Sequence, residues 1–326
     1  MAPVAFTRRS LLGAVPALGL ASSLAGNAFG QVTGSRLAQP DERYSDVSLD
    51  AWVDVYGRPT AKVMLNGQGP FSFMVDTGST TTVIAERHVK ALAAPIIGMM
   101  TVNGTTGTSD TPMASLANLE TGVVTKKDIR VAVLSDYGLG REDGILGADV
   151  FAGKRLSFDI PAKSVRVEPS RREMRRLNSV TNMRVRNGLL AEIDGSIGRV
   201  SAKLMLDTGA QNCIANPVLS EALLKAYPHL VRHSNVSVVG VTGQVITGDY
   251  LELPKIDFKE FAVKDSGAVV ADAPIFRIWG LDREPAMIVG VNLLSRLSTF
   301  SIDYGAREFD ARLLADMIAR SGQLQG

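Results

Sequence analysis

Short stretches of alternating apolar and polar residues run along most of the chain, with turn residues between them. The stretch Ala61 to Leu65 leads into Asn66-Gly67, and the following stretch ends with Phe73-Met74-Val75. Alternation with a period of two is typical of half-buried strands, and Asn-Gly between two such strands is a strong hairpin signal. The pattern therefore predicts a β-hairpin whose second strand ends at Asp76.

The same order of features returns later in the chain. The stretch Leu189 to Ile193 precedes Asp194-Gly195, and the next stretch ends with Leu204-Met205-Leu206, directly before Asp207. Asp-Gly is a hairpin signal of the same kind, so a turn is predicted at Asp194-Gly195. The two aspartates are 207 − 76 = 131 residues apart. A repeat at this distance indicates two copies of one β unit.

Three further pairs of segments keep their order in both copies, although the loops between them differ in length. They are Val102–Gly107 with Val238–Gly243, Gly144–Asp149 with Met287–Asn292, and Leu156–Asp159 with Phe300–Asp303. We therefore expect two small barrel-like lobes, residues 50–170 and 183–310, related by a pseudo-twofold axis. Residues 171–182 between them carry an arginine cluster, which fits a solvated basic linker better than an anion-binding patch.

Helical signals are few. Asn216 is a favoured helix cap and Pro217 suits a first helical turn, so a short helix is predicted to Ala226. A second helix is predicted from Ala306 to Arg320. Residues 311–326 are expected to form a C-terminal helix or tail. Many short strands with glycine-rich turns outweigh these helices, and the expected fold class is mostly β with short helices.

Composition narrows the class of protein further. The chain has 326 residues, of which 45% are apolar and 21% charged, so a wholly disordered or coiled-coil protein is excluded. This length corresponds to about two domains. The single cysteine excludes an internal disulfide and a four-cysteine zinc site. Three widely spaced histidines (His88, His229 and His233) argue against a histidine metal centre, and no metal or organic cofactor is expected.

The net charge of +2 arises in the first thirty residues, which contain Arg8 and Arg9 and no acidic residue. Without them 35 − 2 = 33 basic residues balance 33 acidic residues. A neutral body has no general electrostatic attraction for nucleic acid, and no nucleic-acid partner is expected.

Residues 1–30 have the pattern of an export signal. The paired arginines precede a short apolar run from Leu11 to Ala21, and Ala28-Phe29-Gly30 offers small residues for signal cleavage. The pair resembles a twin-arginine (Tat) signal of bacteria. The run is shorter than the roughly 20 residues that span a bilayer, and Pro16 interrupts it. We expect a periplasmic or secreted protein with no membrane span in the mature chain. Residues 31–49 are a linker or a short pro-segment.

Both strand ends carry the same turn, Asp76-Thr77-Gly78-Ser79 in the first copy and Asp207-Thr208-Gly209-Ala210 in the second. These turns resemble those of the aspartic proteases. A further segment, Asp143-Gly144-Ile145-Leu146-Gly147, looks like a pepsin-type segment of the same proteins. The resemblance is to the retropepsin-like proteins of bacteria with two lobes in one chain, and it covers roughly residues 50–310. It implies an endopeptidase that acts on peptide or protein substrates. Because both lobes are in one chain, a monomer is expected.

The resemblance implies that Asp76 and Asp207 are catalytic. Two carboxylates that share one proton can take a proton from water and donate one to the substrate carbonyl. Gly78 and Gly209 permit tight turns in which backbone amides approach the carboxylates. Thr77 and Thr208 would bond to the opposite lobe, as the threonines of the family do.

The two turns differ at their fourth residue. The hydroxyl of Ser79 is expected to bond the outer oxygen of Asp76 and to favour its ionised form, which Ala210 cannot do for Asp207. Asp207 is therefore predicted to carry the shared proton more often, with activity at milder acidity than in pepsin-like enzymes.

Two glycine- and threonine-rich stretches fall where retropepsins carry their substrate-binding flaps, with plain β-turns as the simpler interpretation. Pepsin-like enzymes have a flap tyrosine, and none stands between Asn103 and Asp110. The predicted flap residues are Gly104, Thr105, Thr106 and Gly107 in the first copy, and Gly240, Val241, Thr242 and Gly243 in the second.

Other candidates are weaker. Cys213 has no evident histidine partner, so buried packing is expected rather than a catalytic thiol. His88 is expected at the surface of a short polar helix. Trp279 either lines a cleft or fills the core.

Two rival functions stay open. One is a bilobal peptide-binding or envelope-scaffold protein that keeps the fold without catalysis. The other is a glycosidase, whose two carboxylates would lie about 5 Å or more apart, too far to share a proton.

Overall fold

The computed structural model describes residues 47–49, 51–54, 57–122, 124–170 and 180–313. The first hairpin consists of β3 (Pro59–Leu65) and β4 (Gln68–Val75). Asn66 and Gly67 between them have φ angles of 50° and 74°. Positive φ at both central residues is what a two-residue hairpin turn requires, so the hairpin predicted here is confirmed.

Six strands of the N-terminal half close into a ring. From β4 the pairing runs to β9 (Gly144–Leu146), β5 (Val83–Ala85), β8 (Val124–Leu134) and β7 (Gly107–Thr121), which returns to β3. β6 (Ile96–Gly104) pairs with β7 outside the ring, and β2 (Ala51–Val53) pairs with β3. Closure leaves no open edge within the ring, and its interior is filled by buried side chains such as Phe73, Val63 and Leu116.

The C-terminal half repeats this pairing strand by strand. The order is β13 (Leu190–Ile197), β14 (Val200–Leu206), β21 (Ala286–Val289), β15 (Cys213–Ala215), β20 (Ser266–Val270), β17 (Val245–Leu253) and β16 (Arg232–Val239). Parallel and antiparallel pairs alternate as in the first half: β14 and β21 are parallel, as β4 and β9 are. The mostly β fold class predicted from the sequence is confirmed, including a closed barrel.

One difference between the halves has a local cause. β7 is a single strand of 15 residues that reaches both β8 and β3. In the C-terminal half the corresponding path is divided into β17 and β18 (Ile256–Asp257), and β18 pairs with β13 and with β19 (Ala262–Val263). Pro254 lies at the break. Proline cannot donate to a strand ladder, which favours a break there, although β7 accommodates Pro112 where it pairs with β6.

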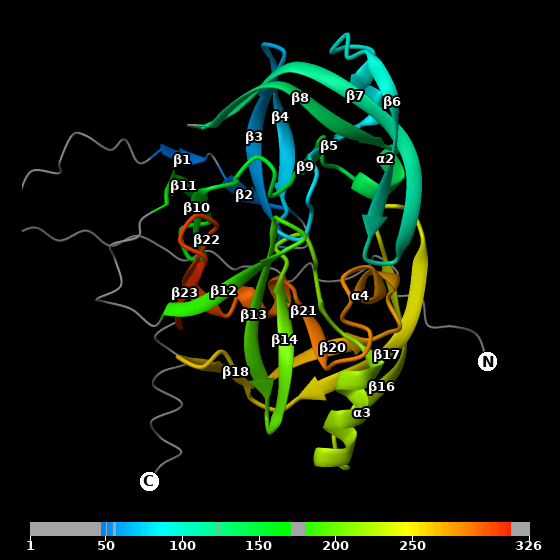
Figure 1. Cartoon of the computed structure of the whole chain (residues 1–326), viewed down its shortest axis with the longest axis vertical. Helices are drawn as coiled ribbons and strands as arrows, with labels where there is room; N and C mark the ends of the chain where they lie inside the picture. The colour runs from blue at the N-terminus through cyan, green and yellow to red at the C-terminus, as the bar shows by residue number, and fades with distance from the viewer. Residues whose placement is uncertain (1–46, 50, 55–56, 123, 171–179, 314–326) are drawn as a thin grey trace, which may run out of the picture. The chain divides into compact units, whose positions relative to one another are not determined.

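The two halves also share a sheet. Its strands are β1 (Val47–Leu49), β11 (Ser164–Pro169), β10 (Lys154–Asp159), β22 (Leu297–Asp303), β23 (Glu308–Leu313) and β12 (Val180–Arg186), in that order. Figure 1 shows β10 beside β22, and Phe158 pairs with Phe300 with ring centroids 4.4 Å apart. The two segments matched in the sequence are therefore direct neighbours, in a sheet that belongs to both halves.

The turn predicted at Asp194-Gly195 is wrong. Both residues lie inside β13, where Asp194 pairs with Lys203 and Gly195 with Ala202, and the chain turns instead at Gly198-Arg199. Asp194 forms an ion pair with Lys203 at 2.8 Å. Gly195 is needed for close packing, because a Cβ there would lie 2.7 Å from the Asp257 carbonyl oxygen.

The helix predicted from Ala306 is also wrong in its described part, because Glu308–Leu313 forms strand β23. Phe309 and Ala311 are buried, whereas Asp310 between them is half-buried. This period of two suits a strand, and pairing with β22 and β12 fixes it. Residues 314–326 lie outside the described residues.

The described helices are short. They are α1 (Glu86–Val89), α2 (Asp136–Leu139), α3 (Pro217–Ala226), α4 (Pro274–Ile278) and α5 (Val291–Leu294). The helix predicted from Pro217 to Ala226 is confirmed, including its Asn216 cap. No helix among the described residues is long and apolar enough to cross a bilayer.

Several predicted segments fall outside the described residues. These are the export signal (1–30), most of the segment at 31–49, and the arginine cluster at 171–176. Val180–Asn182, expected as the end of the linker, instead form the first part of β12 and pair with β23. Pairing with an existing strand satisfies their backbone groups, which a solvated linker would leave to water.

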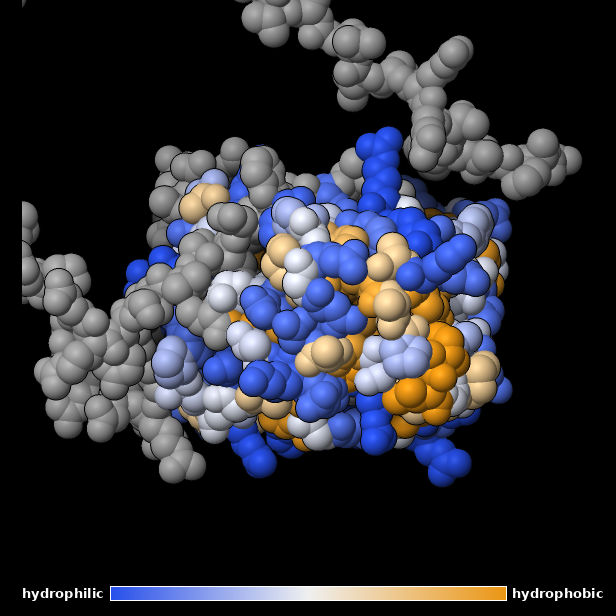
Figure 2. Space-filling model, turned by 90° about the horizontal axis from the view of Figure 1, so that it is seen from above, coloured by the Kyte–Doolittle hydropathy of each residue, from blue (hydrophilic) through white to orange (hydrophobic). Residues whose placement is uncertain are grey.

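β6 presents an apolar outer surface. Ile96, Ile97 and Met99 are 51%, 45% and 63% exposed. In Figure 2, seen from above, apolar surface gathers on one side of the face shown. Substitutions at these exposed positions leave the buried core unchanged.

Asn216 is predicted to be a main contributor to stability in the C-terminal half. Its side chain accepts from Leu219 N (2.8 Å) and donates to Leu281 O and Glu284 O (2.7 Å each). Asn216→Ala removes the helix cap and leaves buried carbonyls unpaired, which lowers the free energy of unfolding by about 2–4 kcal/mol. Urea unfolding measures the loss. Asn182→Ala, at an exposed position, is the control, and an equal effect of the two substitutions would contradict the prediction.

Candidate active site

The two aspartates occupy equivalent places in the halves. Asp76 follows β4 directly, and its backbone N–H donates to Leu146 O at 3.0 Å. Asp207 follows β14, and its N–H donates to Val289 O at 3.1 Å. The parallel neighbours β9 and β21 thus hold both strand ends in place, and all their residues are buried.

The carboxyls of Asp76 and Asp207 lie close enough together to act on each other's pKa. A Cβ at Gly78 would overlap the carboxyl of Asp207, and a Cβ at Gly209 would overlap that of Asp76. Each glycine therefore lies directly against the carboxyl of the other half. No other residue fits at either position without separating the carboxyls.

Reciprocal hydrogen bonds between Thr77 and Thr208 join the two turns. Thr77 N donates to Thr208 Oγ1 at 3.2 Å, and Thr208 N donates to Thr77 Oγ1 at 3.1 Å. The hydroxyls donate in turn to the strand of the opposite half, Thr77 to Leu206 O at 2.9 Å and Thr208 to Val75 O at 2.7 Å. Both threonines are fully buried, so these bonds form out of water.

Backbone amides support each carboxylate. Gly78 N donates to Asp76 Oδ1 at 2.8 Å, and the N–H groups of Gly209 and Ala210 donate to Asp207 Oδ1 at 2.9 Å each. The bond expected from the Ser79 hydroxyl to Asp76 is not formed, because that hydroxyl donates to Thr81 O at 2.8 Å. The prediction was wrong because a local bond within the turn satisfies the hydroxyl first.

Burial raises the pKa of both carboxyls above its ordinary value, and the pKa of Asp207 is raised further by the negative charge of Asp76. Backbone hydrogen bonds and the positive charge of Arg58 act in the opposite direction on Asp76. Burial and neighbouring charges, rather than the Ser79 hydroxyl, therefore act on the two carboxyls. The shared proton on Asp207 expected from the sequence stays a prediction.

Such a pair holds an acid and a base within one hydrogen bond of each other. The charged carboxylate can remove a proton from water while the neutral one donates to a developing oxyanion. The two pKa values belong to the pair rather than to either residue alone.

The predicted flap residues lie at the tips of two hairpins that touch each other. The β6–β7 tip carries Thr106, whose hydroxyl donates to Gln244 O at 2.9 Å. In return Gln244 Nε2 donates to Thr108 O at 3.0 Å, and Thr242 Oγ1 donates to Gly107 O at 3.3 Å. Gln244, at the start of β17, was not among the predicted residues, because only contact across the halves reveals it.

Two further residues fix the segments after the turns. Asp149 accepts from the Thr82 hydroxyl at 2.9 Å and from Thr82 N at 3.2 Å. In the second half Asn292 Oδ1 accepts from Cys213 N at 2.9 Å. Both residues stand two positions after the glycine that follows β9 or β21. This shared position in the repeat was the sequence signal that could have identified them.

The weaker candidates are now placed. Cys213 is buried, and burial raises its pKa to about 12, so packing is its role. His88 is part-buried rather than at the surface, because it bonds Asp143 at 2.6 Å and packs on Phe71. Trp279 fits both alternatives given for it, since it is buried in the core and also lines a cavity next to Gly78.

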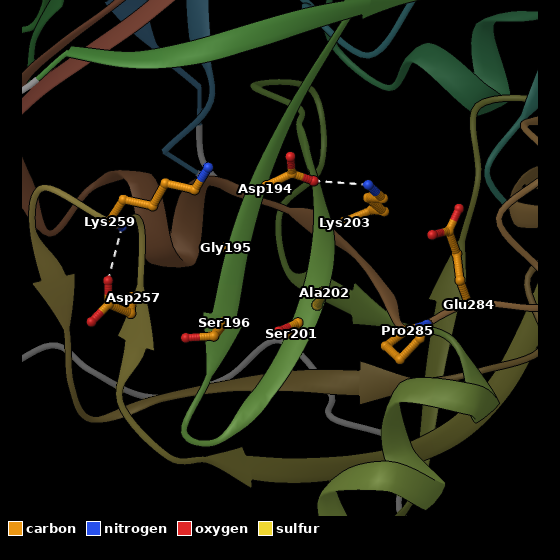
Figure 3. Close-up of a pocket in the computed structure, with 10 residues that line it drawn as sticks. All are labelled: Asp194, Gly195, Ser196, Ser201, Ala202, Lys203, Asp257, Lys259, Glu284 and Pro285. Atoms are coloured by element: carbon orange, nitrogen blue, oxygen red, sulfur yellow. Dashed lines mark hydrogen bonds and ion pairs between the residues drawn. The ribbon is translucent and has the colours of Figure 1, made fainter.

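A larger hollow of about 580 Å³ lies elsewhere in the C-terminal half. Figure 3 shows its lining on the β13–β14 hairpin, β18 and the Glu284-Pro285 segment, with acidic and basic side chains mixed. None of its lining residues belongs to the two turns or the hairpin tips. Among the described residues, no group of three or more acidic, histidine or cysteine side chains is placed to hold a metal ion.

Comparison with known proteins gives one match. A family model described as "Aspartyl protease" matches residues 61–150, which contain β3, β4, the Asp76 turn and β9. The match supports aspartic protease activity in general terms and does not extend to the Asp207 turn. No curated protein matches the chain.

The threonine contacts predict a loss of stability in Thr208→Val. The substitution keeps the volume but leaves Thr77 N and Val75 O unpaired in the core, which lowers the free energy of unfolding by about 2–4 kcal/mol. Thr208→Ser keeps the hydroxyl and is the matched control, with less than half that loss. Urea unfolding of both variants tests this, and equal losses would show that the hydroxyl contributes nothing.

The raised pKa of Asp207 predicts a pH-dependent stability difference. The folded protein binds more protons than the unfolded chain between the ordinary and the raised pKa, so wild-type stability falls as pH rises through that range. Asp207→Asn lacks this dependence and should be more stable than wild type at pH 7, with the difference shrinking toward pH 3. Thermal unfolding across pH measures it. Asp272→Asn, at an exposed carboxylate, should show no such trend; a constant difference for Asp207→Asn would contradict the assignment.

Proposed function

We propose that the protein is an aspartic endopeptidase in which Asp76 and Asp207 together activate one water molecule. The proximity of the two carboxyls carries the proposal: each lies against the glycine of the opposite turn, at the end of one of two equivalent strands. The "Aspartyl protease" match over residues 61–150 supports the class of reaction. No metal or organic cofactor takes part in the proposed reaction.

In the proposed reaction, charged Asp76 accepts a proton from water as the water oxygen bonds to the peptide carbonyl carbon. Neutral Asp207 donates its proton to the carbonyl oxygen, which gives a tetrahedral intermediate. Asp76 then donates its proton to the peptide nitrogen while Asp207 takes a proton from a hydroxyl of the intermediate. The C–N bond breaks, an acid and an amine are released, and both carboxyls are restored. The threonine bonds and the turn amides keep the carboxyls in place throughout, so little reorganisation is needed.

We propose that the substrate lies extended beneath the two hairpin tips, bonded through its backbone. The tips supply the binding residues Gly104, Thr105, Thr106, Gly107, Gly240, Val241, Thr242 and Gly243, to which we add Gln244. The hydrogen bonds that Thr106, Thr242 and Gln244 form between the two tips support this role, because they hold the tips against each other. Entry of a substrate requires these contacts to open.

The wider organisation is part of the proposal. Residues 50–170 and 183–310 act as the two lobes of one catalytic unit, active as a monomer, and the repeated strand pairing supports this. Residues 1–30 direct export, by the twin-arginine route, to the periplasm or the exterior. The paired Arg8 and Arg9 before a short apolar run support this location.

The glycosidase alternative is disfavoured, because each carboxyl lies against the glycine of the opposite turn and acts on the pKa of the other, whereas glycosidase carboxyls lie about 5 Å or more apart. A peptide-binding or scaffold protein without turnover is the remaining alternative. Both aspartates and their supporting bonds are complete, which favours catalysis.

The expected activity is cleavage of an unbiased peptide library by the purified chain at acidic to neutral pH. Asp76→Asn and Asp207→Asn each remove one partner of the proton exchange and should lower the rate at least about 100-fold. A pepstatin-type inhibitor should block wild-type cleavage. Mass spectrometry of the digests, with circular dichroism to verify folding, measures the outcome.

Asp272→Asn is the matched control, because it makes the same chemical change at an exposed carboxylate and should retain full activity. Peptide binding without cleavage by the folded wild type would favour the scaffold alternative. Cleavage that persists in both dyad variants would exclude the proposed mechanism.

A further inference from the structure

Arg58 lies opposite Asp76 in the first barrel. In the antiparallel pair of β3 and β4, Thr60 is the partner of Met74. The same register, continued by two residues, places Arg58 opposite Asp76. Directly opposite residues of an antiparallel pair point to the same face of the sheet, with Cβ atoms roughly 4.5–5.5 Å apart. The first aspartate therefore has an arginine as its neighbour across the strands.

Asp54 fixes Arg58 from the other side. Val53 is the partner of Pro59 in the pair of β2 and β3, and this pairing extends by one residue, because Asp54 N donates to Arg58 O at 2.9 Å. The Arg58 Nε atom donates to Asp54 Oδ2 at 2.6 Å. The two side chains are 17% and 4% exposed. Asp54, Arg58 and Asp76 thus form a row of charged groups across three neighbouring strands (Figure 1), largely shielded from water.

The second barrel has an apolar residue at the equivalent place. Glu192 is the partner of Met205 in the pair of β13 and β14, and the same continuation by two residues places Leu190 opposite Asp207. Leu190 is buried. Its own partner on β12 is Arg186, which lies one strand further from the aspartate and bonds the buried Glu192. The two carboxyls of the pair therefore have unlike neighbours, an arginine in one barrel and a leucine in the other.

This difference acts on the charge of the pair. A positive charge near a carboxyl favours its ionised form. Burial, the largest effect, raises the pKa of Asp76, whereas backbone hydrogen bonds and the charge of Arg58 act to lower it. For Asp207 the neighbouring charge is that of Asp76, which adds to the effect of burial. Groups shielded from water are screened little by salt, so the effect of Arg58 persists at ordinary ionic strength.

Two further titratable groups face this row. Glu142, before β9, is buried, which raises its pKa, and it accepts from the Ser72 hydroxyl at 2.8 Å. Tyr304 is also buried, which raises the pKa of its phenol, and the charges of the two aspartates raise it further. Tyr304 thus stays neutral at acidic and neutral pH, and Glu142 is neutral or negative. Neither group can replace the positive charge of Arg58.

We propose that Arg58 is a positioning residue of the pair: its charge keeps the negative charge on Asp76 and leaves the shared proton on Asp207. Asp54 limits this effect, because its carboxylate holds the guanidinium and cancels part of its charge. The inference rests on the proposed function and adds to it the residue that decides which carboxyl acts as the base.

The test is the pH dependence of kcat/KM for peptide cleavage. Arg58→Leu gives the first barrel the residue of the second, and its acidic limb should move to higher pH by at least about 0.5 pH unit. Asp54→Asn should move the limb in the opposite direction, to lower pH, because Arg58 then acts with its full charge. Arg58→Lys keeps the charge and should keep the limb close to that of wild type.

Opposite shifts from two neighbouring substitutions separate a charge effect from a loss of packing, which would lower the rate in both variants without moving the limb. Arg277→Leu and Asp272→Asn make the same changes in an exposed ion pair and are the matched controls, with the limb of wild type. If Arg58→Leu fails to fold, its combination with Asp54→Asn removes both charges of the ion pair. That double variant should still place the limb above that of wild type.

A second measurement does not require turnover. Carbon-13 NMR of the aspartate carboxyls should show Asp76 ionising at lower pH than Asp207 in the folded wild type, with a smaller separation in Arg58→Leu. An unchanged separation, an unmoved limb in active Arg58→Leu, or shifts of the same sign in Arg58→Leu and Asp54→Asn would overturn the inference and leave the proposed function standing. Absence of cleavage by the folded wild type would remove the proposed function, and the NMR titration would still show which carboxyl holds the charge.

Discussion

The reciprocal hydrogen bonds between Thr77 and Thr208 are the constraint on which the rest of the structure depends. They are buried, and they join segments 131 residues apart. The two threonine hydroxyls also donate to Leu206 O and Val75 O, at the ends of strands β14 and β4. Because the threonines precede Gly78 and Gly209, the same contact brings each glycine against the opposite carboxyl. The position of the two aspartates is thus a consequence of the hydrogen bonds between the threonine hydroxyls and the backbone of the opposite half.

Much of the fold and the site could be predicted from the sequence because the signals are local. Asn66-Gly67 forms its turn through its own backbone preferences, and Asn216-Pro217 begins a helix for the same reason. The repeat placed Asp76 and Asp207 at equivalent strand ends, where the structure has them. The proton on Asp207 was expected because of the Ser79 hydroxyl, but that hydroxyl bonds Thr81. Burial raises the pKa of both carboxyls, and the charge of Asp76 raises the pKa of Asp207 further.

The features that could not be predicted depend on partners far away in the chain. Asp194-Gly195 has the composition of a turn, but Lys203 and the approach of Asp257 hold it in a strand. An equal offset from Asn66-Gly67 leads to residues 197–198, one residue before the actual turn at Gly198-Arg199, so the repeat was the better guide than composition. Glu308–Leu313 becomes a strand because β22 and β12 are there to pair with it. The contact of Gln244 with Thr108 and the cavity next to Gly78 could likewise not be predicted, because both depend on residues from the two halves.

The sheet shared by the two halves has a consequence for the order in which the molecule is made. The ring of the N-terminal half is complete once β9 has been synthesised, since all its strands lie between residues 59 and 146. The shared sheet is different, because β12 and β22 obtain a common neighbour only when β23 emerges. A growing polypeptide therefore carries its first aspartate in a formed barrel long before the second can meet it. On the proposed function, a nascent chain whose second barrel has not yet formed holds only one carboxyl of the pair and cannot catalyse the reaction.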